Sequence, residues 1–334
     1  MNIIQEMNRY LGVRLQCAFS RKKPGDCVPM LFLGGMNRTG NHLLHSLLDG
    51  HPMIKAVPEE DWFLSRNISS LVSQLSLFWN SALGNVNGTV DLMLKQNEGD
   101  FWNGKAGKVG PGYKVDFEIL DYGRFRAGLE RLAAERRISL RDIYSGYIDR
   151  VLESIPSDAR HKAKPAWRMY FVASSDYLIR PMMSWDPRNK AIVSLRDPLQ
   201  RFGSIKKWSN RSFICDEVQL ENWWKVHNSY KLFRDRYKER ILFVDYDDMV
   251  TDTAKAMSRV TDFLGINYHD ILSRPTLLGR SVGSNTSFSD GSRTSGVIHR
   301  DSLTKYKKLL TGEEVGILKR RLRPLYLEIT GKEG

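Results

Sequence analysis

The segment 29–48, PMLFLGGMNRTGNHLLHSLL, constrains the fold more than any other part of this chain. It begins with a short apolar run at 30–33, which is typical of a buried strand. Two glycines end that run, a polar turn follows, and from Asn41 onward leucines recur at helical spacing. The segment therefore predicts a strand, a glycine-rich loop and a helix, which together direct backbone N–H groups and the positive helix end toward one anion.

The spacing of two glycines in this loop, Gly35-x4-Gly40, is that of a phosphate-binding loop. A loop of the ATP-binding type continues with Lys for the phosphates and then Ser or Thr for Mg²⁺. Asn41 and His42 occupy those two positions here, and the cation lies inside the loop, at Arg38. The pattern predicts an anion-binding loop without the hydroxyl that holds magnesium. An ordinary glycine turn between a strand and a helix is the structural alternative.

A second segment, KAIVSLRDPLQRFGSIKKW at 190–208, combines a buried strand with a basic strand end. Arg196-Asp-Pro ends the strand, and the proline suits the first turn of a helix. Ser204 follows Arg196 by eight residues and lies on that helix. The planar guanidinium and the hydroxyl can converge on one phosphate. A structural ion pair is the alternative for Arg-Asp-Pro alone.

Both segments resemble the sulfotransferases that use 3′-phosphoadenosine 5′-phosphosulfate (PAPS), particularly the glycan and tyrosylprotein enzymes. Their 5′-phosphosulfate loop reads roughly G-x-x-R-S-G-T-T-L-L, followed by a helix and His-Pro; here it reads GMNRTGNHLL, and His51-Pro52 follows. Their 3′-phosphate motif, R-D-P-x-x-R-x-x-S, is matched in full at 196–204. The chain departs from the loop pattern at Asn41 and His42, where the family has two Thr.

The resemblance implies which residues bind the cofactor. It places the 3′-phosphate between Arg196 and Ser204, and it has Arg38 neutralise charge on the sulfuryl and bridging oxygens. The implied contacts of the 5′-phosphosulfate loop are Gly35, Arg38, Thr39, Gly40, Asn41 and His42. Weaker matches to the family's Y-x-x-L/M-V, N-S-S-F and S-L-x-x-W runs add Tyr246, Ser287 and Lys305. Sheet capping, or a solvated loop and helix, is the structural alternative for these three.

The resemblance also implies a general base. A Glu lies a few residues beyond His-Pro in the family, and Glu59 follows Arg38 by twenty-one residues, as in the tyrosylprotein enzymes. Glu60 is the fallback, and acidic residues at a helix start are the structural alternative. Arg38 and His42 complete the implied catalytic set, with His42 a competing base because imidazole titrates near neutrality. The family's Lys-x-Pro lysine corresponds to either Lys162 or Lys164.

The expected chemistry needs no metal. A sulfuryl group carries less negative charge than a phosphoryl group, so fixed cations and backbone donors can stabilise its transfer. Cys17, Cys27 and Cys215 have no metal-binding spacing, and the histidines include no HExxH. The resemblance implies PAPS, released as 3′-phosphoadenosine 5′-phosphate (PAP), as the cofactor, and no metal is expected beside it.

The net charge of +13 leaves other function classes open. A non-catalytic polyanion- or RNA-binding module would explain such an excess, and a nucleotide cofactor or an acidic glycan would explain it as well. The loop spacing leaves a P-loop kinase-like enzyme as a further alternative, although the chain lacks Lys-[Ser/Thr] and an evident Walker B Asp. Homeodomain, zinc-finger and RNA-binding signatures do not occur, so no nucleic-acid partner is expected. By resemblance the acceptor is a sugar hydroxyl; a peptide tyrosine, a lipid or a small molecule remains open.

Strands that alternate with helices predict an α/β fold, P-loop-like and three-layered, with a central parallel β-sheet flanked by helices and ligand sites at the strand ends. We expect a lead segment at 1–28 and a single sulfotransferase-like domain at 29–334, with a helical acceptor-site insertion at about 66–160. The expected elements are a strand at 53–57, a strand and turn at 241–250, and helices at 71–83, 125–155 and 253–264, the last ended by Gly265. A mixed apolar run lies at 169–172, and a basic helix is expected from 302.

The N-terminal sequence and one glycosylation motif favour the cytoplasm. Residues 1–28 begin with Met1 and hold no apolar stretch long enough for a signal or membrane helix. The motif Asn37-Arg38-Thr39 lies within the anion-binding loop, where a glycan would block the site. We therefore expect a cytoplasmic protein without a transmembrane segment.

Overall fold

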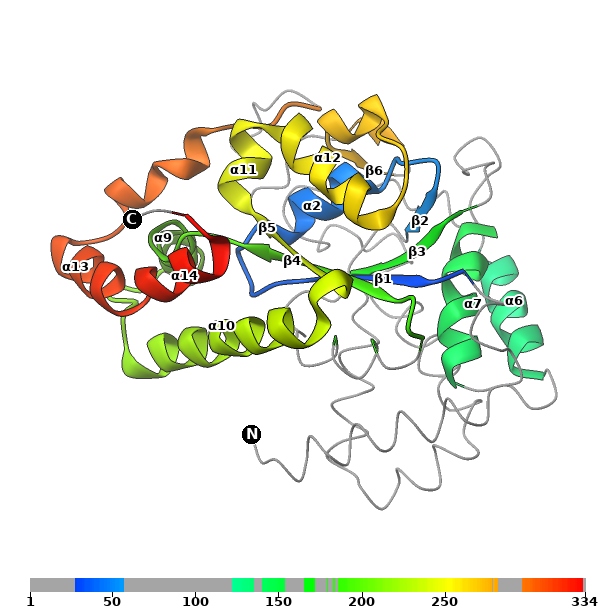
Figure 1. Cartoon of the computed structure of the whole chain (residues 1–334), viewed down its shortest axis with the longest axis horizontal. Helices are drawn as coiled ribbons and strands as arrows, with labels where there is room; N and C mark the ends of the chain where they lie inside the picture. The colour runs from blue at the N-terminus through cyan, green and yellow to red at the C-terminus, as the bar shows by residue number, and fades with distance from the viewer. Residues whose placement is uncertain are drawn as a thin grey trace, which may run out of the picture.

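A five-stranded parallel β-sheet forms the centre of the molecule (Figure 1). The computed structural model describes residues 28–56, 122–134, 140–153, 165–171, 179, 183, 186–277, 279–281 and 296–332. The strands are β1 (Met30–Gly34), β2 (Ile54–Ala56), β3 (Trp167–Phe171), β4 (Lys190–Leu195) and β5 (Ile241–Asp245). Their order in the sheet is β2-β3-β1-β4-β5, and each pair of neighbours is parallel.

This strand order places a ligand site at one edge of the sheet. All carboxyl ends of a parallel sheet lie on the same edge. The chain leaves β1 toward β2 and later leaves β4 toward β5, in opposite directions across the sheet. The ends of β1 and β4, which are neighbours, therefore flank the point where the strand order reverses, and ligands of open α/β sheets bind at such points.

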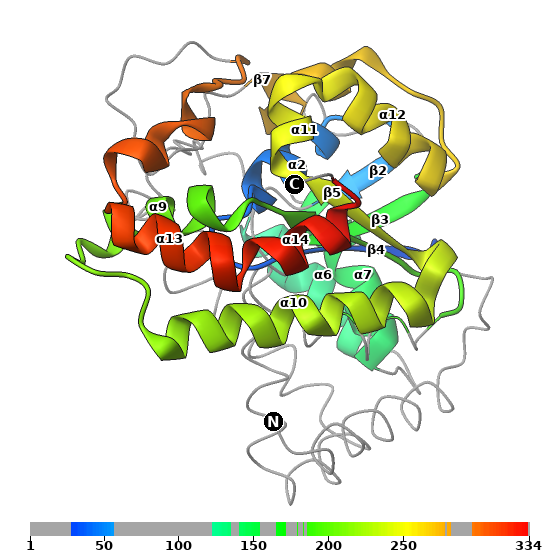
Figure 2. The same cartoon turned by 60° about the vertical axis from the view of Figure 1, so that its left-hand side comes forward.

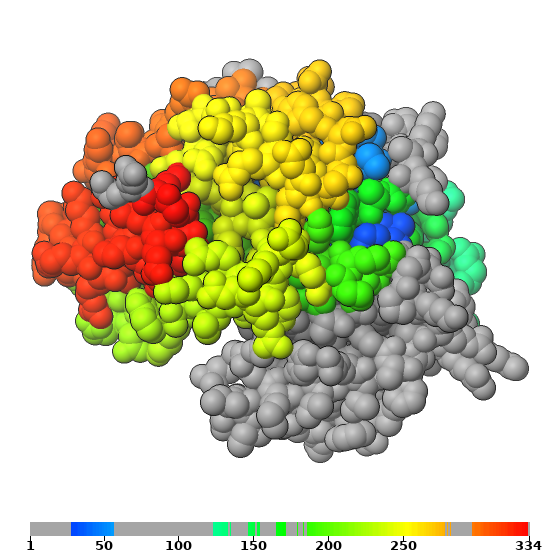
Figure 3. Space-filling view, viewed as in Figure 1, coloured from blue at the N-terminus to red at the C-terminus, as the bar shows by residue number. Residues whose placement is uncertain are grey.

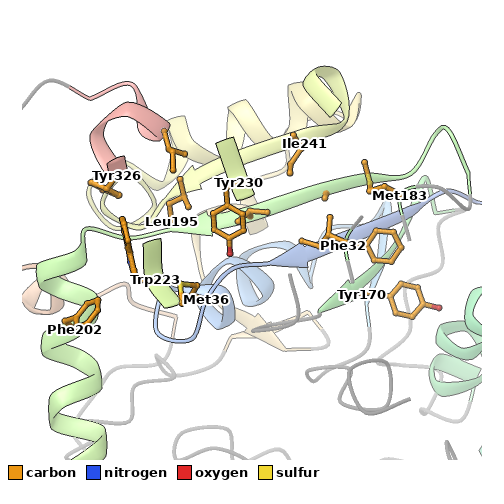
Figure 4. Close-up of a cluster of buried hydrophobic side chains, with 14 of the residues drawn as sticks. Phe32, Met36, Tyr170, Met183, Leu195, Phe202, Trp223, Tyr230, Ile241 and Tyr326 are labelled. Atoms are coloured by element: carbon orange, nitrogen blue, oxygen red, sulfur yellow. The ribbon is translucent and has the colours of Figure 1, made fainter. Parts of the chain in front are cut away.

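Helices cover both faces of the sheet, because strand residues alternate between two apolar cores. Phe32, Tyr170 and Val193 face the core beneath α10 (Glu217–Tyr237), and Figure 4 labels Phe32 and Tyr170 in this core. Further helices also contribute to it, namely α6 (Tyr122–Ala134), α7 (Leu140–Glu153), α9 (Pro198–Ser209), α13 (Gly312–Arg321) and α14 (Arg323–Thr330). Leu33 and Ile192 face the core covered by α2 (Asn41–Leu48), α11 (Tyr246–Thr251) and α12 (Thr253–Leu264). Figure 2 shows α10 on one side of the sheet and α11 and α12 on the other. The expected α/β architecture with a flanked parallel sheet is confirmed.

The remaining elements surround this centre. The helices are α2 (Asn41–Leu48), α6 (Tyr122–Ala134), α7 (Leu140–Glu153), α9 (Pro198–Ser209), α11 (Tyr246–Thr251), α12 (Thr253–Leu264), α13 (Gly312–Arg321) and α14 (Arg323–Thr330). Short elements are η5 (Lys238–Arg240), η6 (Asp270–Ser273), η7 (Asp301–Leu303), η8 (Lys305–Lys308), β6 (Thr276–Leu277) and β7 (Arg280–Ser281). In the space-filling view the C-terminal helices (red) pack against α10 (yellow-green) (Figure 3).

Local sequence signals explain several helix ends. Asp197 caps α9, since its carboxylate accepts a hydrogen bond from the Leu199 N–H at 2.8 Å, and Pro198 occupies the first turn. Asp252 caps α12, which ends at Gly265 in the left-handed conformation with φ of 68°. The expected bounds of α12 are confirmed at both ends.

Other expectations need adjustment. The strands expected at 53–57 and within 241–250 are confirmed as β2 and β5, and the apolar run that begins at Met169 belongs to β3. The helix expected at 125–155 consists of two helices, α6 and α7. The basic helix expected from 302 is two short 3₁₀ helices, η7 and η8. Helix α10 was not expected. The helix at 71–83 and most of the insertion at 66–160 lie outside the described residues, so the domain division stays a prediction.

Candidate active site

The loop between β1 and α2 needs its two glycines. Gly35 has φ of 139° and Gly40 has φ of 99°, conformations that side chains rarely adopt. A Cβ at Gly40 would lie 2.3 Å from Cδ2 of Tyr246, so the ring packs directly on the loop backbone. The first hydrogen bond of α2 runs from the Leu44 N–H to the Gly40 carbonyl at 3.0 Å. The N–H groups of the first turn thus point out of the helix end, where an anion can bind.

Thr39 and Asn41 turn their side chains inward. They are 1% and 5% exposed and meet Ser194 of β4. The Thr39 hydroxyl donates to the Met36 carbonyl at 2.7 Å and lies 2.8 Å from the Ser194 hydroxyl, which also contacts Oδ1 of Asn41. Nδ2 of Asn41 donates to the Gly35 carbonyl at 2.9 Å. These side chains therefore stiffen the loop, and Thr39 and Asn41 can offer a ligand only their backbone N–H groups.

Two arginines hold loop carbonyls. Nε of Arg201 donates to the Asn37 carbonyl at 3.0 Å, and Nη1 of Arg196 donates to the Arg38 carbonyl at 3.1 Å. Both arginines come from the second sequence motif, and both are buried. The loop carbonyls are thereby directed into the protein, toward positive charge, and the motif after β4 shapes the loop after β1.

Arg196 has a fixed guanidinium at the end of β4. Its Cζ lies 3.9 Å from the centre of the Tyr246 ring, a cation–π contact. Nε donates to Oε1 of Gln200 at 3.2 Å, and Nη2 donates to the Ser302 carbonyl at 3.1 Å. Burial lowers the pKa of Arg196, and the nearby Tyr246 and Asp247 oppose that change.

Arg38 connects the two motifs. It has φ of 71°, and its Nε donates to the Ser204 hydroxyl at 3.0 Å. Burial, and then the charge of Arg196, lowers the pKa of Arg38. The structure thus brings Arg38, Arg196 and Ser204 together, with Arg38 in contact with both of the others. The sequence interpretation paired Arg196 with Ser204 and had not assigned a contact between Arg38 and Ser204.

His42 follows the loop in the first turn of α2 and is exposed. Its ring meets the edge of Phe171 at the end of β3, with ring centres 4.9 Å apart, and the buried His45 stacks on the same Phe171 at 5.2 Å. Although His42 keeps solvent access, the protein surrounding it lowers its pKa to about 4, helped by His45 and Arg38. The imidazole is therefore neutral at pH 7.

The weaker sequence matches have mixed outcomes. The Tyr246 hydroxyl lies 2.8 Å from the Ser302 hydroxyl, and its ring packs on Gly40 and Arg196, so it lies at the site. Lys305 makes an ion pair with Asp301 at 2.8 Å on the neighbouring 3₁₀ segment. The other candidates, namely Glu59, Glu60, Lys162, Lys164 and Ser287, lie outside the described residues.

Sequence reasoning missed Ser194, Gln200, Arg201 and Ser302. Arg201 had a signal, because it is the second Arg of the motif R-D-P-x-x-R-x-x-S. Ser194 had none, since a serine in a buried strand carries no local mark of its partner. Within the described residues, no three His, Cys, Asp or Glu side chains gather as metal ligands, and no helix has the length and apolar character needed to cross a bilayer.

The assembled groups are hydrogen-bond donors suited to a phosphate- or sulfate-bearing ligand. They comprise the guanidinium groups of Arg38 and Arg196, the Ser204 hydroxyl and the first-turn N–H groups of α2. Charge-assisted bonds from such donors bind anionic oxygens strongly. The site lies at the ends of β1 and β4, where the strand order reverses.

Comparison with known proteins places this site in context. A family model described as "Sulfotransferase domain" matches residues 29–277. Among solved structures, the sulfotransferase domain from the curacin biosynthetic pathway is 14% identical, with 91% of this chain and 98% of that chain covered and a TM-score of 0.53. At this identity, the likeness demonstrates a shared fold.

Two further solved structures have TM-scores below 0.5. The sulfotransferase domain of the Synechococcus PCC 7002 olefin synthase is 17% identical, covers 90% of this chain and 97% of that chain, and has a TM-score of 0.49. A mouse sulfotransferase complexed with PAP is 13% identical, with 95% of this chain and 88% of that chain covered, and has a TM-score of 0.39. A search of curated proteins found no match.

Proposed function

This chain belongs to the sulfotransferase family, and from that premise we propose that it transfers the sulfuryl group of PAPS to a hydroxyl of a carbohydrate acceptor. One observation carries the proposal: Arg196 binds the Arg38 carbonyl, and Arg38 binds Ser204, at the N-terminus of α2. The two motifs expected to hold the opposite ends of PAPS thus form one site. PAPS supplies an activated sulfuryl group when bound, and the family uses this cofactor.

The residues present fit PAPS. The first-turn N–H groups of α2, the loop N–H groups and Arg38 would bind the 5′-phosphosulfate, with Thr39 and Asn41 contributing through their backbones. Fixed donors of this kind can stabilise charge that develops on sulfuryl and bridging oxygens. Neutral His42 would add a hydrogen bond to the same group. Tyr246, Ser287 and Lys305 remain candidate contacts of the nucleotide.

Arg196 and Ser204 would bind the 3′-phosphate, the group that distinguishes PAP from AMP. Titration calorimetry should show PAP binding at least tenfold more tightly than AMP, which corresponds to about 1.4 kcal/mol. Arg196→Ala should abolish that preference. Equal affinity of the wild-type protein for the two nucleotides would contradict the assignment.

Glu59 would accept the proton of the acceptor hydroxyl. It follows β2, whose end at Ala56 lies on the same edge of the sheet as the anion-binding loop. His42 is the weaker choice, because a pKa of about 4 makes it a poor proton acceptor. Loss of a general base costs about 10²–10⁴ in rate, so Glu59→Gln should lower kcat by that factor and leave PAP affinity within a few-fold.

Glu60→Gln is the matched control for the base. It should retain most of the turnover if Glu59 is the base. If Glu60→Gln loses turnover and Glu59→Gln does not, Glu60 is the base. If both variants stay active, the proton acceptor lies elsewhere in the chain.

The acceptor class rests on the resemblance to glycan sulfotransferases. A transfer assay with mass readout should compare sugar hydroxyls with peptide tyrosine, a lipid and a small phenol. Product formed only from a non-sugar acceptor would overturn the carbohydrate proposal and leave sulfuryl transfer in place. We also propose a cytoplasmic location and a single catalytic domain over 29–334, both from the sequence.

A further inference from the structure

A chain of hydrogen bonds leads from Arg196 through Gln200 to Asp247. Nε of Arg196 donates to Oε1 of Gln200 at 3.2 Å. The amide Nε2 of Gln200 then donates to both carboxylate oxygens of Asp247, at 2.8 and 3.0 Å. Gln200 is buried, with 7% of its surface exposed, and comes from the first turns of α9, whereas Asp247 belongs to α11. Three elements that meet at the end of the sheet are thus connected through one side chain.

The chemistry of the partners dictates the orientation of Gln200. A guanidinium can only donate hydrogen bonds, and a carboxylate can only accept them. A residue between the two must accept on one side and donate on the other, which the neutral amide of glutamine does. The contact also uses the Nε edge of Arg196, so the fork of the two Nη groups remains directed toward Arg38 and Ser302.

Asp247 is half-buried and differs in its contacts from two buried carboxylates nearby. Asp197 caps α9 and pairs with Arg323 at 3.4 Å, and Asp245 pairs with Lys332 at 3.1 Å and accepts a hydrogen bond from Tyr326. Asp247 directs both oxygens at Gln200. Burial, followed by the charge of Asp245, raises the pKa of Asp247, while the Gln200 hydrogen bond opposes that rise.

We propose that Gln200 and Asp247 are positioning residues that fix the orientation of Arg196 and thereby set the preference of this site for nucleotides with a 3′-phosphate. The inference rests on the proposed function, in which Arg196 binds that phosphate. Tyr246 restrains the guanidinium from its face, and Gln200 restrains it from its edge. A restrained guanidinium loses less rotational freedom when it binds a phosphate. Removal of the restraint should therefore weaken the binding of PAP and leave the binding of AMP unchanged.

The experiment compares the affinities of PAP and AMP, measured by calorimetry, among matched variants. Gln200→Met keeps the length of the side chain and removes its hydrogen bonds to Arg196 and to Asp247. It should lower the ratio of PAP to AMP affinity roughly fivefold, raise KM for PAPS and leave kcat within twofold. Gln219→Met makes the same substitution on α10, at a half-buried position outside this network, and should leave the ratio unchanged.

A swapped pair tests the hydrogen bonds themselves. In the double variant Gln200→Glu with Asp247→Asn, a carboxylate accepts from Arg196 and an amide donates to that carboxylate. The net charge and the donation from Arg196 are kept, and the contact between positions 200 and 247 is kept with its donor and acceptor exchanged. The double variant should therefore recover PAP preference to within about twofold, as a coupled pair requires. Asp247→Asn alone should also lower the preference for PAP. This second variant tests the proposal even if Gln200→Met fails to fold.

The outcomes separate the two proposals. If wild-type protein does not prefer PAP, the assignment of the 3′-phosphate fails, and this inference fails with it. If wild-type protein prefers PAP and Arg196→Ala abolishes the preference, but Gln200→Met and Asp247→Asn keep it, only this inference is overturned. Equal weakening of PAP and AMP in Gln200→Met would also overturn it, because a general structural defect does not discriminate between the nucleotides.

Discussion

At the scale of single residues, His227 is an uncharged histidine in the core. Its ring stacks on Trp223 with centres 3.6 Å apart, and Nδ1 lies 2.9 Å from the Trp223 carbonyl, to which it donates in the neutral form. Nε2 is buried and has no hydrogen-bond partner in the part of the chain that the structure describes. Complete burial lowers the pKa of His227 to about 3, with a smaller contribution from the charge of Arg201.

This histidine should make stability depend on pH. The unfolded chain binds a proton at His227 near pH 6.5, whereas the folded protein binds it only near pH 3. The unfolding free energy should therefore fall as pH decreases through this window, by about 1.4 kcal/mol per pH unit from this group. Urea titrations at pH 7, 6 and 5 should show a smaller decrease for His227→Gln. The exposed His269→Gln should behave like wild type, and a wild-type slope in His227→Gln would contradict this account.

Gly40 faces two separate constraints that a side chain would violate. Its φ is 99°, and an added Cβ would lie 2.3 Å from Tyr246, the ring that supports Arg196. Gly40→Ala should lower thermal stability and weaken PAP binding, because the ring must move. Gly265→Ala is the control. Its φ is 68°, and an added Cβ would have no neighbouring atom within 4 Å. Only the backbone conformation should then lower the unfolding free energy, by roughly 1–2 kcal/mol. Equal losses in the two variants would argue against the ring contact.

At the scale of elements, Glu314 connects α13 to α9. Its side chain is fully buried, with one carboxylate oxygen 2.7 Å from Nζ of Lys206 and the other 2.9 Å from the Ile214 N–H. It also completes the capping box of α13 with Thr311. Burial raises its pKa, but the hydrogen bonds from Lys206, Thr311 and Ile214 outweigh this and hold the pKa below its usual value.

Loss of this carboxylate should destabilise the packing of α13 on α9. Glu314→Ala should cost about 3 kcal/mol of unfolding free energy, because Lys206 is left largely buried without its partner. The neighbouring Glu313 is exposed, so Glu313→Ala should cost less than about 0.5 kcal/mol. Chemical denaturation of both variants measures the difference, and similar values would show that the buried pair contributes little.

At the scale of the whole molecule, the positive charge of the site comes from its own side chains. Arg38 and Arg196 meet at the N-terminus of α2, and the Asn41 side chain, at the position of the lysine of ATP-binding loops, is engaged with the loop carbonyls. Fixed cations and helix N–H groups can meet the charge demand of sulfuryl transfer. We therefore expect turnover in EDTA to stay within about twofold of turnover with Mg²⁺. A strict Mg²⁺ requirement would favour the kinase-like alternative.

The elements whose signals are local can be predicted from the amino-acid sequence. The apolar run before Gly34, the glycine spacing after it and the Asp252 and Gly265 caps of α12 depend on residues within a few positions of one another. Such signals predicted β1, β2, β4 and β5, the anion-binding loop and the edge at which the site lies. They did not predict α10. Its sequence mixes charged and aromatic residues, and its buried face includes a histidine, His227.

The direction in which the site side chains face depends on contacts between segments that are far apart in the chain. Thr39 and Ser194 are 155 residues apart, as Arg38 and Ser204 are 166 apart, and these contacts form because β1 and β4 are neighbours in the sheet. Strand order follows from how helices pack on both faces, which no single segment encodes. From the sequence alone, a polar residue in the loop is therefore interpreted as a ligand contact. The structure shows that the Thr39 hydroxyl instead contacts the buried Ser194 of β4.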